Sequence, residues 1–520
     1  MAVPIITTVA GVQSFLQTLA QASSTAEPKN ALANLGLVPT MGALHRGHLS
    51  LIERARHENQ WVMVSLFVNP LQFAPTEDLD RYPQRLEQDQ QLCEQAGVDA
   101  IFAPSPSELL GEGTITAVVP PISLTQGLCG ASRPGHFQGV ATIVLKLLNL
   151  IGPDRAYFGR KDAQQLAIIQ RLVKDLNVPV EIVPCPIVRE ASGLALSSRN
   201  QYLDEAQQQT ATILHDSLQA AQRCFQEGMR DRNSLLTKIR HTLAQEPDVT
   251  LEYAELVDPV TLQPLADIEG VGMVAIAAHL NNTRLIDNIV LDARQPILAI
   301  DGPAGAGKST VTRLCAQALG LQYLDTGAMY RAITWLVLQS QIKLDNSLAI
   351  ADLVSQSDIK LQLDANPERL PSVWVQGKDV TEAIRTPEVT QSVSTIAAQS
   401  AVRQALVQQQ RVLGQAGGIA AEGRDIGTHV FPDAGLKIFL TASIAERARR
   451  RQQDLAQRGA APIDFEALQQ QIARRDQKDS QRAISPLCKA YDAVEVNTDG
   501  LSITEVTEQI VALYRNSLTQ

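Results

Sequence analysis

The sequence predicts an α/β protein with parallel sheets and more than one folding unit. Its 520 residues are too many for a single ordinary hydrophobic core, because domains of about 100–200 residues are typical. In the first half, short apolar runs rich in β-branched residues alternate with helical stretches, as in βαβ units. A further apolar run, Ile297 to Ile300, leads directly into a glycine-rich loop and opens another such unit.

The first unit is predicted to span residues 1–186. Its elements, in order, are strands at Leu35 to Thr40 and Trp61 to Val68 with a helix from Gly47 to Glu58 between them, a helix from Leu86 to Gln95, a strand at Ala100 to Ala103, a long helix after Gly139, and a strand at Val180 to Val183.

Residues 187–293 are predicted to form a small α+β lobe. The segment from Ser197 to Ala244 is Gln-rich and is predicted to be helical. Strands are expected at Leu251 to Val257 and at Gly272 to Ile276. The short polar segment Ala293 to Pro296 follows. We therefore place the main boundary there, and residues 294–520 form the last unit.

Charge and cysteine usage exclude several classes of function. The net charge of -10, from 45 Lys and Arg against 55 Asp and Glu, makes nucleic acid an unexpected partner. The six cysteines form no CxxC or Cys/His cluster, which disfavours structural zinc and a disulfide framework. No apolar stretch is long enough to span a bilayer, so no membrane partner and a reduced cytoplasmic location are expected.

Residues 302–309 read Gly-Pro-Ala-Gly-Ala-Gly-Lys-Ser and fit the phosphate-binding pattern GxxxxGK[ST], between an apolar strand and a helix from Thr310 to Leu319. Such a loop turns backbone amides toward ATP phosphates, its lysine bridges the transferred phosphoryl group, and its serine can bind Mg²⁺. The predicted ATP-binding residues are Gly302, Gly305, Gly307, Lys308, Ser309 and Thr310, with Lys308 catalytic and Ser309 on the metal. The loop alone does not distinguish a kinase from a motor, a GTPase or a regulatory switch.

Arginines recur beside aspartates after the predicted strands of this unit, at Asp325 to Arg331, Glu422 to Thr428 and Arg475 to Arg482. Several such arginines suit a second anionic substrate, whose charge must be neutralised for in-line phosphoryl transfer. From about Pro296 onward these motifs resemble cytidylate kinase, a P-loop nucleoside monophosphate kinase. The resemblance implies that the CMP or dCMP phosphate, ribose and base are bound by Arg331, Arg424, Arg482, Asp479, Ser394, Arg403 and Asp425.

The same resemblance implies two accessory parts of the kinase. Residues 355–385, with a strand at Val373 to Val375, would be the CMP-binding insert. The Arg-rich run Arg447 to Arg451, with Arg474 and Arg475, resembles a lid that closes over ATP and excludes water. A solvated helix face is the alternative for this run.

In the first half, Pro39 to His48 joins a strand to a helix and contains His45-Arg-Gly-His48. Two histidines at this spacing can donate hydrogen bonds to a departing pyrophosphate, or they can be metal ligands or a helix cap. The HxGH string resembles the signature of Rossmann-like nucleotidyltransferases, and Ser197-Ser-Arg199 resembles their second phosphate-binding motif.

Longer strings match pantothenate synthetase over about residues 1–292: Phe67 to Phe73, Arg133 to Phe137, Phe158 to Gln165 and Leu196 to Asn200. Such enzymes make pantoyl-adenylate from pantoate and ATP, and the β-alanine amine then attacks the acyl phosphate. The resemblance implies catalytic roles for His45, His48, Lys161 and Arg199. It implies ATP contacts from these four and from Met41, Gly42, Gly159, Asp162, Val188, Leu196, Ser197 and Ser198.

Neutral amides would orient the small substrates of this first site. Gln72, Gln165 and Asn69 are expected to bind pantoate and β-alanine, because a fixed positive charge would hold the pantoate carboxylate too tightly for its attack. Asp89 either helps to hold Mg²⁺ or is a solvated helix residue. Mg²⁺ is expected with ATP in both halves, and a dimer through the N-terminal domain is implied by the resemblance.

One position departs from the family pattern. Arg160 stands where the family usually has an acidic or amide residue, and an altered nucleotide contact is expected there rather than lost activity. Two rival readings also remain open. The same folds could act on UMP or on another small carboxylate, or one half could be a nucleotide-binding regulatory module without turnover.

Overall fold

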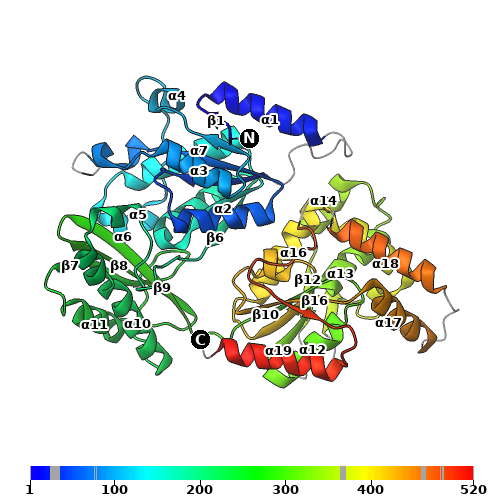
Figure 1. Cartoon of the computed structure of the whole chain (residues 1–520). Helices are drawn as coiled ribbons and strands as arrows, with labels where there is room; N and C mark the ends of the chain where they lie inside the picture. The colour runs from blue at the N-terminus through cyan, green and yellow to red at the C-terminus, as the bar shows by residue number, and fades with distance from the viewer. Residues whose placement is uncertain are drawn as a thin grey trace. The chain divides into compact units, whose positions relative to one another are not determined.

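A computed structural model describes residues 2–23, 35–74, 77, 79–362, 371–457, 464–480, 482 and 485–518. Residues 363–370 of the predicted insert lie outside this described part. The chain forms two compact units, residues 1–293 and 294–520 (Figure 1).

The first unit is built on a six-stranded parallel sheet with strand order β1-β4-β3-β2-β5-β6. Alternate side chains of β2 enter two different apolar clusters, as the two-residue period of a strand requires. Helices α1 and α7 cover one face, and α2 and α3 cover the other. The elements are β1 (Ile5–Ile6), α1 (Val9–Ser23), β2 (Leu35–Thr40), α2 (Arg46–Glu58), β3 (Trp61–Leu66), α3 (Leu86–Gln95), β4 (Ala100–Phe102), α7 (His136–Ile151), β5 (Arg155–Gly159), α8 (Ala163–Asp175) and β6 (Glu181–Cys185).

A small lobe completes this unit. Its three antiparallel strands pair in the order β7-β8-β9, and α10 and α11 cover one face of them (Figure 1). The lobe consists of α9 (Glu205–Ala211), α10 (Ile213–Gln226), α11 (Arg232–Leu243), β7 (Val249–Val257), β8 (Val271–Leu280) and β9 (Thr283–Asp292). Its other face packs on α5 (Ile122–Thr125), α6 (Leu128–Ser132) and α8.

The second unit has a five-stranded parallel sheet in the order β11-β15-β10-β16-β17. Helices α12 and α19 cover one face, and α13 and α16 cover the other. The elements are β10 (Leu298–Asp301), α12 (Lys308–Leu319), β11 (Gln322–Asp325), α13 (Thr326–Gln339), α16 (Ser400–Leu413), β15 (Ile419–Glu422), β16 (Leu436–Thr441), β17 (Val494–Asn497) and α19 (Ile503–Ser517).

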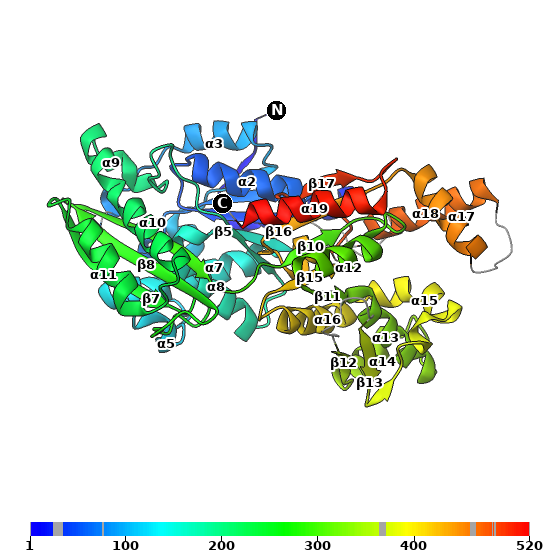
Figure 2. The ribbon, with the colours of Figure 1, turned by 90° about the horizontal axis from the view of Figure 1, so that it is seen from below.

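Two appendages extend from this second sheet. One is a small antiparallel sheet with helices beside it: α14 (Ser347–Ser355), β12 (Ile359–Gln362), β13 (Ser372–Val375), β14 (Lys378–Asp379) and α15 (Pro387–Ala397). The other is a helix pair, α17 (Ile444–Gln457) and α18 (Phe465–Ser480). Figure 2 shows the two appendages at separate places on this unit.

The structure confirms the α/β class with parallel sheets, and β2 and α3 have the predicted bounds. Strand β3 ends at Leu66 instead of Val68, because Asn69 caps a 3₁₀ turn that begins with Pro70. Helix α7 begins at His136 rather than Gly139, since Gly135 before it has a left-handed φ of 82°. Strand β9 was not predicted. None of the described helices is long and apolar enough to cross a membrane.

Candidate active sites

A cavity of about 280 Å³ opens at the carboxyl ends of β2, β3 and β5, the edge where parallel sheets bind ligands. Most of the predicted residues of the first half line it. They are Met41, His45, His48, Asn69, Gln72, Gly159, Lys161, Asp162, Gln165, Val188, Leu196, Ser197, Ser198 and Arg199. Gly42, Asp89 and Arg160 are not among its lining residues.

The two histidines begin α2 with stacked rings, whose centroids are 4.0 Å apart. Nδ1 of His45 accepts the amide hydrogen of Gly47 at 3.1 Å, and Nδ1 of His48 accepts that of His45 at 3.4 Å. Each neutral ring therefore carries its hydrogen on Nε2, where it can be donated to a ligand. Burial, together with the charge of the nearby Lys161, lowers the pKa of His45 to about 4 and that of His48 to about 3. The pair forms a neutral donor site beside a cation.

The helix-cap and hydrogen-bond-donor interpretations of the histidine pair are compatible. Each ring caps the helix through Nδ1, which leaves Nε2–H free to donate to a ligand. The metal reading lacks the ligands that it needs. Among the described residues, no group of three or more His, Cys, Asp or Glu side chains could hold a metal ion.

Asp89 lies behind the loop that precedes α2. Its carboxylate oxygens accept the amide hydrogens of Ala43 at 2.9 Å and Leu44 at 2.8 Å. The side chain is buried, and burial raises its pKa, although the two amides counteract this. The solvated alternative for Asp89 is therefore wrong. Its oxygens hold the loop that leads into His45, and its carboxylate also fills the space beside Gly42.

The amide of Gln72 is held by two neighbours. Asn69 Nδ2 donates to Gln72 Oε1 at 3.1 Å, and Gln72 Nε2 lies 2.9 Å from the sulfur of Met41. Asn69 is buried and also donates to the carbonyl of Gly139 at 3.1 Å. A Cβ on Gly139 would lie 2.3 Å from the carbonyl oxygen of Leu71. The absence of a side chain at Gly139 therefore lets the turn with Gln72 pack directly on α7.

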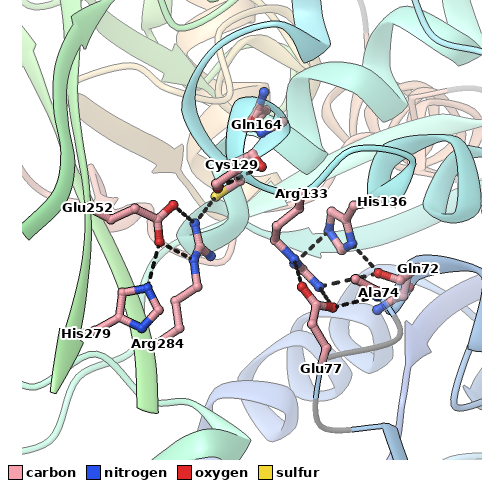
Figure 3. A network of polar contacts seen from close by, with 12 residues as sticks. Gln72, Ala74, Glu77, Cys129, Arg133, His136, Gln164, Glu252, His279 and Arg284 are labelled. Atoms are coloured by element: carbon pink, nitrogen blue, oxygen red, sulfur yellow. Dashed lines mark hydrogen bonds and ion pairs between the residues drawn. The ribbon is translucent and has the colours of Figure 1, made fainter. Parts of the chain in front are cut away.

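A charged network supports the same turn from the other side (Figure 3). Nδ1 of His136 donates to the carbonyl of Gln72 at 2.7 Å, and its Nε2 accepts from Arg133 at 3.1 Å. Arg133 also makes a two-pronged ion pair with Glu77, at 2.6 and 2.7 Å. Burial, together with the charge of Arg133, lowers the pKa of His136 to about 4. The segment from Arg133 to Phe137 was part of the family resemblance, but no role was predicted for Arg133 or His136.

The small lobe contributes residues that sequence reasoning missed entirely. Tyr253, Met273, Arg284, Asp287 and Asn288 line the cavity from its strands. Arg284 pairs with Glu252 at 2.7 and 2.9 Å and donates to the sulfur of Cys129 at 3.4 Å, which links the lobe to α6 (Figure 3). No sequence motif marks these positions, since they lie far along the chain from the loops that they face.

In the second unit, the loop between β10 and α12 has the geometry of a phosphate-binding loop. Gly302 has a φ of 148°, and a Cβ there would lie 2.1 Å from the carbonyl oxygen of Leu440. Gly305 and Gly307 are also left-handed, with φ of 80° and 91°. Lys308, Ser309 and Thr310 then form the first turn of α12, whose amides favour anions. Lys308 is buried, and burial lowers its pKa, as do Arg424 and Arg475.

The predicted CMP residues form two groups. Arg424 and Arg482 meet at Asp479: Arg424 Nε donates to it at 3.1 Å, and Arg482 lies 3.6 Å from it. Arg424 also donates to the carbonyl of Gly302 in the phosphate-binding loop at 2.5 Å. Arg424 therefore links Asp479 to the phosphate-binding loop.

The second group lies around α13 and α16. Arg403 is ion-paired with Asp425, and both are buried. Arg331 pairs with Asp325 at 2.8 Å. In the described part of the chain, Arg331 Nε, Arg403 Nε and Arg482 Nη2 are buried without a hydrogen-bond partner, as is the Tyr330 hydroxyl. Buried donors of this kind suit an anionic or polar ligand. Ser394 is exposed on α15.

Two buried carboxylates at the ends of β10 and β15 were given no role by sequence reasoning. Asp301 accepts the amide hydrogens of Ile426 and Gly427 at 2.8 and 2.7 Å. Burial raises its pKa to about 7. Glu422 accepts from the Ser309 hydroxyl at 2.8 Å and from the Tyr323 hydroxyl. Burial also raises the pKa of Glu422, as does Asp325. The sequence signal that could have identified both carboxylates is an acidic residue at the end of an apolar strand.

The Arg-rich run on α17 makes buried contacts with the phosphate-binding loop. Arg447 is buried, pairs with Asp476 at 2.6 Å and donates to the carbonyl of Ala304 in the phosphate-binding loop at 3.1 Å. Arg450 donates to the carbonyl of Thr498 at 2.8 Å. These arginines hold the helix pair to the loop, so the run is not simply a solvated face.

Comparisons with known proteins agree across both units. The family model for pantoate-beta-alanine ligase matches residues 5–290, and that for cytidylate kinase matches residues 298–516. A bifunctional pantoate ligase/cytidylate kinase from Acaryochloris marina is 62% identical over 99% of this chain and 98% of its own length. One from Trichormus variabilis is 61% identical over 94% of this chain and 92% of its own.

A solved structure is similar to the first unit. The crystal structure of pantothenate synthetase from Thermus thermophilus is 44% identical, with a TM-score of 0.51, and the match covers 55% of this chain and 98% of that one.

Proposed function

The chain belongs to the family of bifunctional pantoate ligase/cytidylate kinases, and we propose that each of its two units carries out one reaction at the site described above. The protein is an enzyme with pantoate–β-alanine ligase and cytidylate kinase activities. The assignment of individual residues that follows is our proposal. The observation that carries it is the neutral donor pair His45 and His48 beside Lys161 in the first unit.

In the ligase site, a carboxylate oxygen of pantoate attacks the α-phosphorus of ATP, and the bond to pyrophosphate breaks. Negative charge grows on the leaving pyrophosphate. Nε2–H of both histidines, the Lys161 ammonium, and the Ser197 to Arg199 segment stabilise that charge. Gln72 orients pantoate, and the Asn69, His136 and Arg133 contacts hold Gln72 in place. Gln165 lines the same cavity and binds the same substrate pair.

In the second ligase step, the β-alanine amine attacks the acyl carbon of pantoyl-adenylate, and the bond to AMP breaks. The amine loses a proton as the amide forms. No pyrophosphate is present in this step, so it does not need the residues that stabilise the leaving pyrophosphate. The two steps therefore depend on different parts of the cavity.

In the kinase site, a phosphate oxygen of CMP attacks the γ-phosphorus of ATP, and ADP leaves. Lys308 and the amides of the loop stabilise the transferred group, and Arg331, Arg424 and Arg482 neutralise the phosphate of CMP. Asp479 binds the ribose, and Arg403, Asp425 and Ser394 select cytosine. Three of these arginines each have a buried guanidinium nitrogen without a hydrogen-bond partner, which supports this assignment.

Both families use ATP, and we propose that Mg²⁺ accompanies it. In the kinase, the Ser309 hydroxyl and the Glu422 carboxylate, 2.8 Å apart, form the oxygen pair that Mg²⁺ prefers near a phosphate-binding loop. Bound there, the ion would neutralise charge on the β- and γ-phosphates. In the ligase, Asp89 already accepts two backbone amides, so we assign it to holding the loop rather than to the ion.

We test the function by supplying purified protein with ATP and CMP, and separately with ATP, pantoate and β-alanine. ADP and CDP should form in the first mixture, and AMP with pyrophosphate in the second. Replacing CMP by UMP and pantoate by other small hydroxy acids tests the substrate choice. Binding of nucleotide without turnover in either mixture would instead support a regulatory role for that unit.

We also propose a cytoplasmic dimer formed through the N-terminal domain. The support is the resemblance to pantothenate synthetases, together with the absence of a bilayer-spanning helix among the described residues. Light scattering on the intact protein should give twice the mass of one chain, and a monomer would contradict the proposal.

A further inference from the structure

Two adjacent side chains of β9, Asp287 and Asn288, reach both of the segments that we propose to bind pyrophosphate. Both are buried, with only 4% and 6% of their surface exposed, and both line the cavity. They pair with Ile276 and Ala275 in the middle of the lobe sheet. They therefore stand on a rigid element rather than on a loop.

Asn288 holds the turn that carries Lys161. Its Nδ2 donates to the carbonyl oxygen of Arg160 at 2.9 Å and to that of Lys161 at 3.0 Å. Both hydrogens of the amide nitrogen are thereby used on consecutive carbonyls of η3 (Arg160–Asp162). The position of this backbone sets where the Lys161 ammonium can reach. It also gives Arg160 a role through its carbonyl.

Asp287 acts on the second segment. Its carboxylate makes a two-pronged ion pair with Arg189, at 2.6 and 2.9 Å. Arg189 is bridged to Ala195 across a tight hairpin, and Leu196 donates to the carbonyl of Val188 at 3.0 Å. The chain leaves this hairpin as the Ser197 to Arg199 segment.

The two contacts are also joined to each other. The backbone amide of Asn288 donates to Oδ1 of Asp287 at 2.8 Å. This one carboxylate oxygen therefore accepts hydrogen bonds from both the backbone of β9 and Arg189. A shift of β9 would therefore move the Lys161 turn and the Ser197 hairpin together.

We propose that Asn288 and Asp287 are positioning residues for adenylate formation, which fix the separation of Lys161 from the Ser197 to Arg199 segment. Neither acts on the reacting atoms directly. Stabilising a leaving pyrophosphate requires donors at fixed positions before the reaction begins, and small displacements are costly. The inference rests on the proposed ligase function of this cavity, and it places control of the first ligase step in the small lobe.

The test separates the two half-reactions in the intact chain. Adenylate formation is measured as exchange of labelled pyrophosphate into ATP with pantoate and without β-alanine. The second step is measured with synthetic pantoyl-adenylate and β-alanine, and CMP phosphorylation by the same sample serves as an internal reference. Asn288→Ala and the similarly sized Asn288→Asp, which lacks the donor hydrogens, should each lower exchange at least about tenfold. The other two activities should stay close to wild type.

A second set of variants tests whether Asp287 acts through Arg189. Asp287→Asn, Arg189→Gln and the double variant should lower exchange by similar amounts, because all three remove the same ion pair. Asn282→Ala, in the exposed turn before β9, is the matched control and should leave exchange unchanged.

Three results would overturn the inference. They are wild-type exchange in Asn288→Asp, an equal loss of both half-reactions in Asn288→Ala and Asn288→Asp, and additive losses from Asp287→Asn and Arg189→Gln. Absence of exchange in the wild-type chain is different, because that result would overturn the proposed ligase function itself.

Discussion

The hydroxyl of Ser309 donates to the carboxylate of Glu422 at 2.8 Å, which joins the first turn of α12 to the end of β15. The other Glu422 oxygen accepts from the Tyr323 hydroxyl. Burial raises the pKa of Glu422. A cation bound beside it would act in the opposite direction, by favouring the charged carboxylate.

Glu422→Gln should therefore weaken the binding of Mg²⁺ by the kinase. The amide keeps the size of the side chain but loses the charge that a divalent cation needs. We expect kcat for CDP formation to fall about 10- to 100-fold, and half-saturation to require more Mg²⁺. Tyr323→Phe removes the second hydrogen bond but keeps the carboxylate, so its magnesium dependence should stay near wild type. An unchanged magnesium titration in Glu422→Gln would contradict the metal role.

The two activities should be lost separately. Lys308→Ala removes the buried ammonium of the phosphate-binding loop and should abolish CDP formation while pantothenate formation stays near wild type. His48→Ala removes one Nε2 donor and should lower adenylate formation about 100-fold or more, with CDP formation retained. Both activities are assayed on each purified variant. Loss of both in a folded variant would reveal coupling between the units.

Gly139→Ala should damage the proposed pantoate site. Its Cβ would lie 2.3 Å from the carbonyl oxygen of Leu71 and 2.8 Å from the amide of Gln72, so the turn must move. Alanine favours helix over glycine by about 1 kcal/mol, so a loss of activity cannot come from helix propensity. We expect KM for pantoate to rise about tenfold or more, measured by steady-state AMP release. Lys146→Ala, at an exposed site of the same helix, is the control. An unchanged KM would show that the turn adapts.

Acid should destabilise the first unit through its buried histidines. The folded pKa values of His45, His48 and His136 are about 4, 3 and 4, all below the ordinary 6.5. Between the folded pKa and 6.5, each of these histidines binds more protons in the unfolded chain than in the folded protein. The free energy of unfolding therefore falls as the pH drops below 6.5, by up to about 1.4 kcal/mol per pH unit for each ring.

Calorimetric scans from pH 7 to about pH 5 measure this slope. A variant with His45→Gln and His48→Gln together should have a shallower one, and His241→Gln, at an exposed site of α11, is the comparison. Equal slopes in wild type and in the double variant would contradict the assignment.

The sequence predicted best those features that local pattern determines. Strand β2 and helix α3 have the predicted bounds because an apolar run and an amphipathic period each define an element without help from distant residues. The phosphate-binding loop and the HxGH turn were identifiable for the same reason, since their glycines, lysine and histidines lie close together in the chain. Both motifs stand at the strand–helix junctions where they were expected.

Contacts between distant residues were not predictable in this way. Glu422 lies 113 residues from Ser309, and Asn288 lies 127 residues from Lys161. Strand β9 itself was missed, because Asp287 and Asn288 interrupt its apolar pattern and both residue types are depleted in strands. Asp89 was placed in the right helix, but its burial behind the HxGH loop depends on tertiary packing.

Strand β9 also limits how this protein can change over evolutionary time. Its side chains alternate between the two faces of the sheet, and Asn288 is held opposite Ala275 by the pairing with β8. Losing or gaining one residue in the turn at Asn281 and Asn282 would shift the whole strand by one place and turn Asn288 to the opposite face. Loops in most enzymes tolerate such length changes, whereas this turn should keep its length as strictly as the catalytic motifs keep their residues.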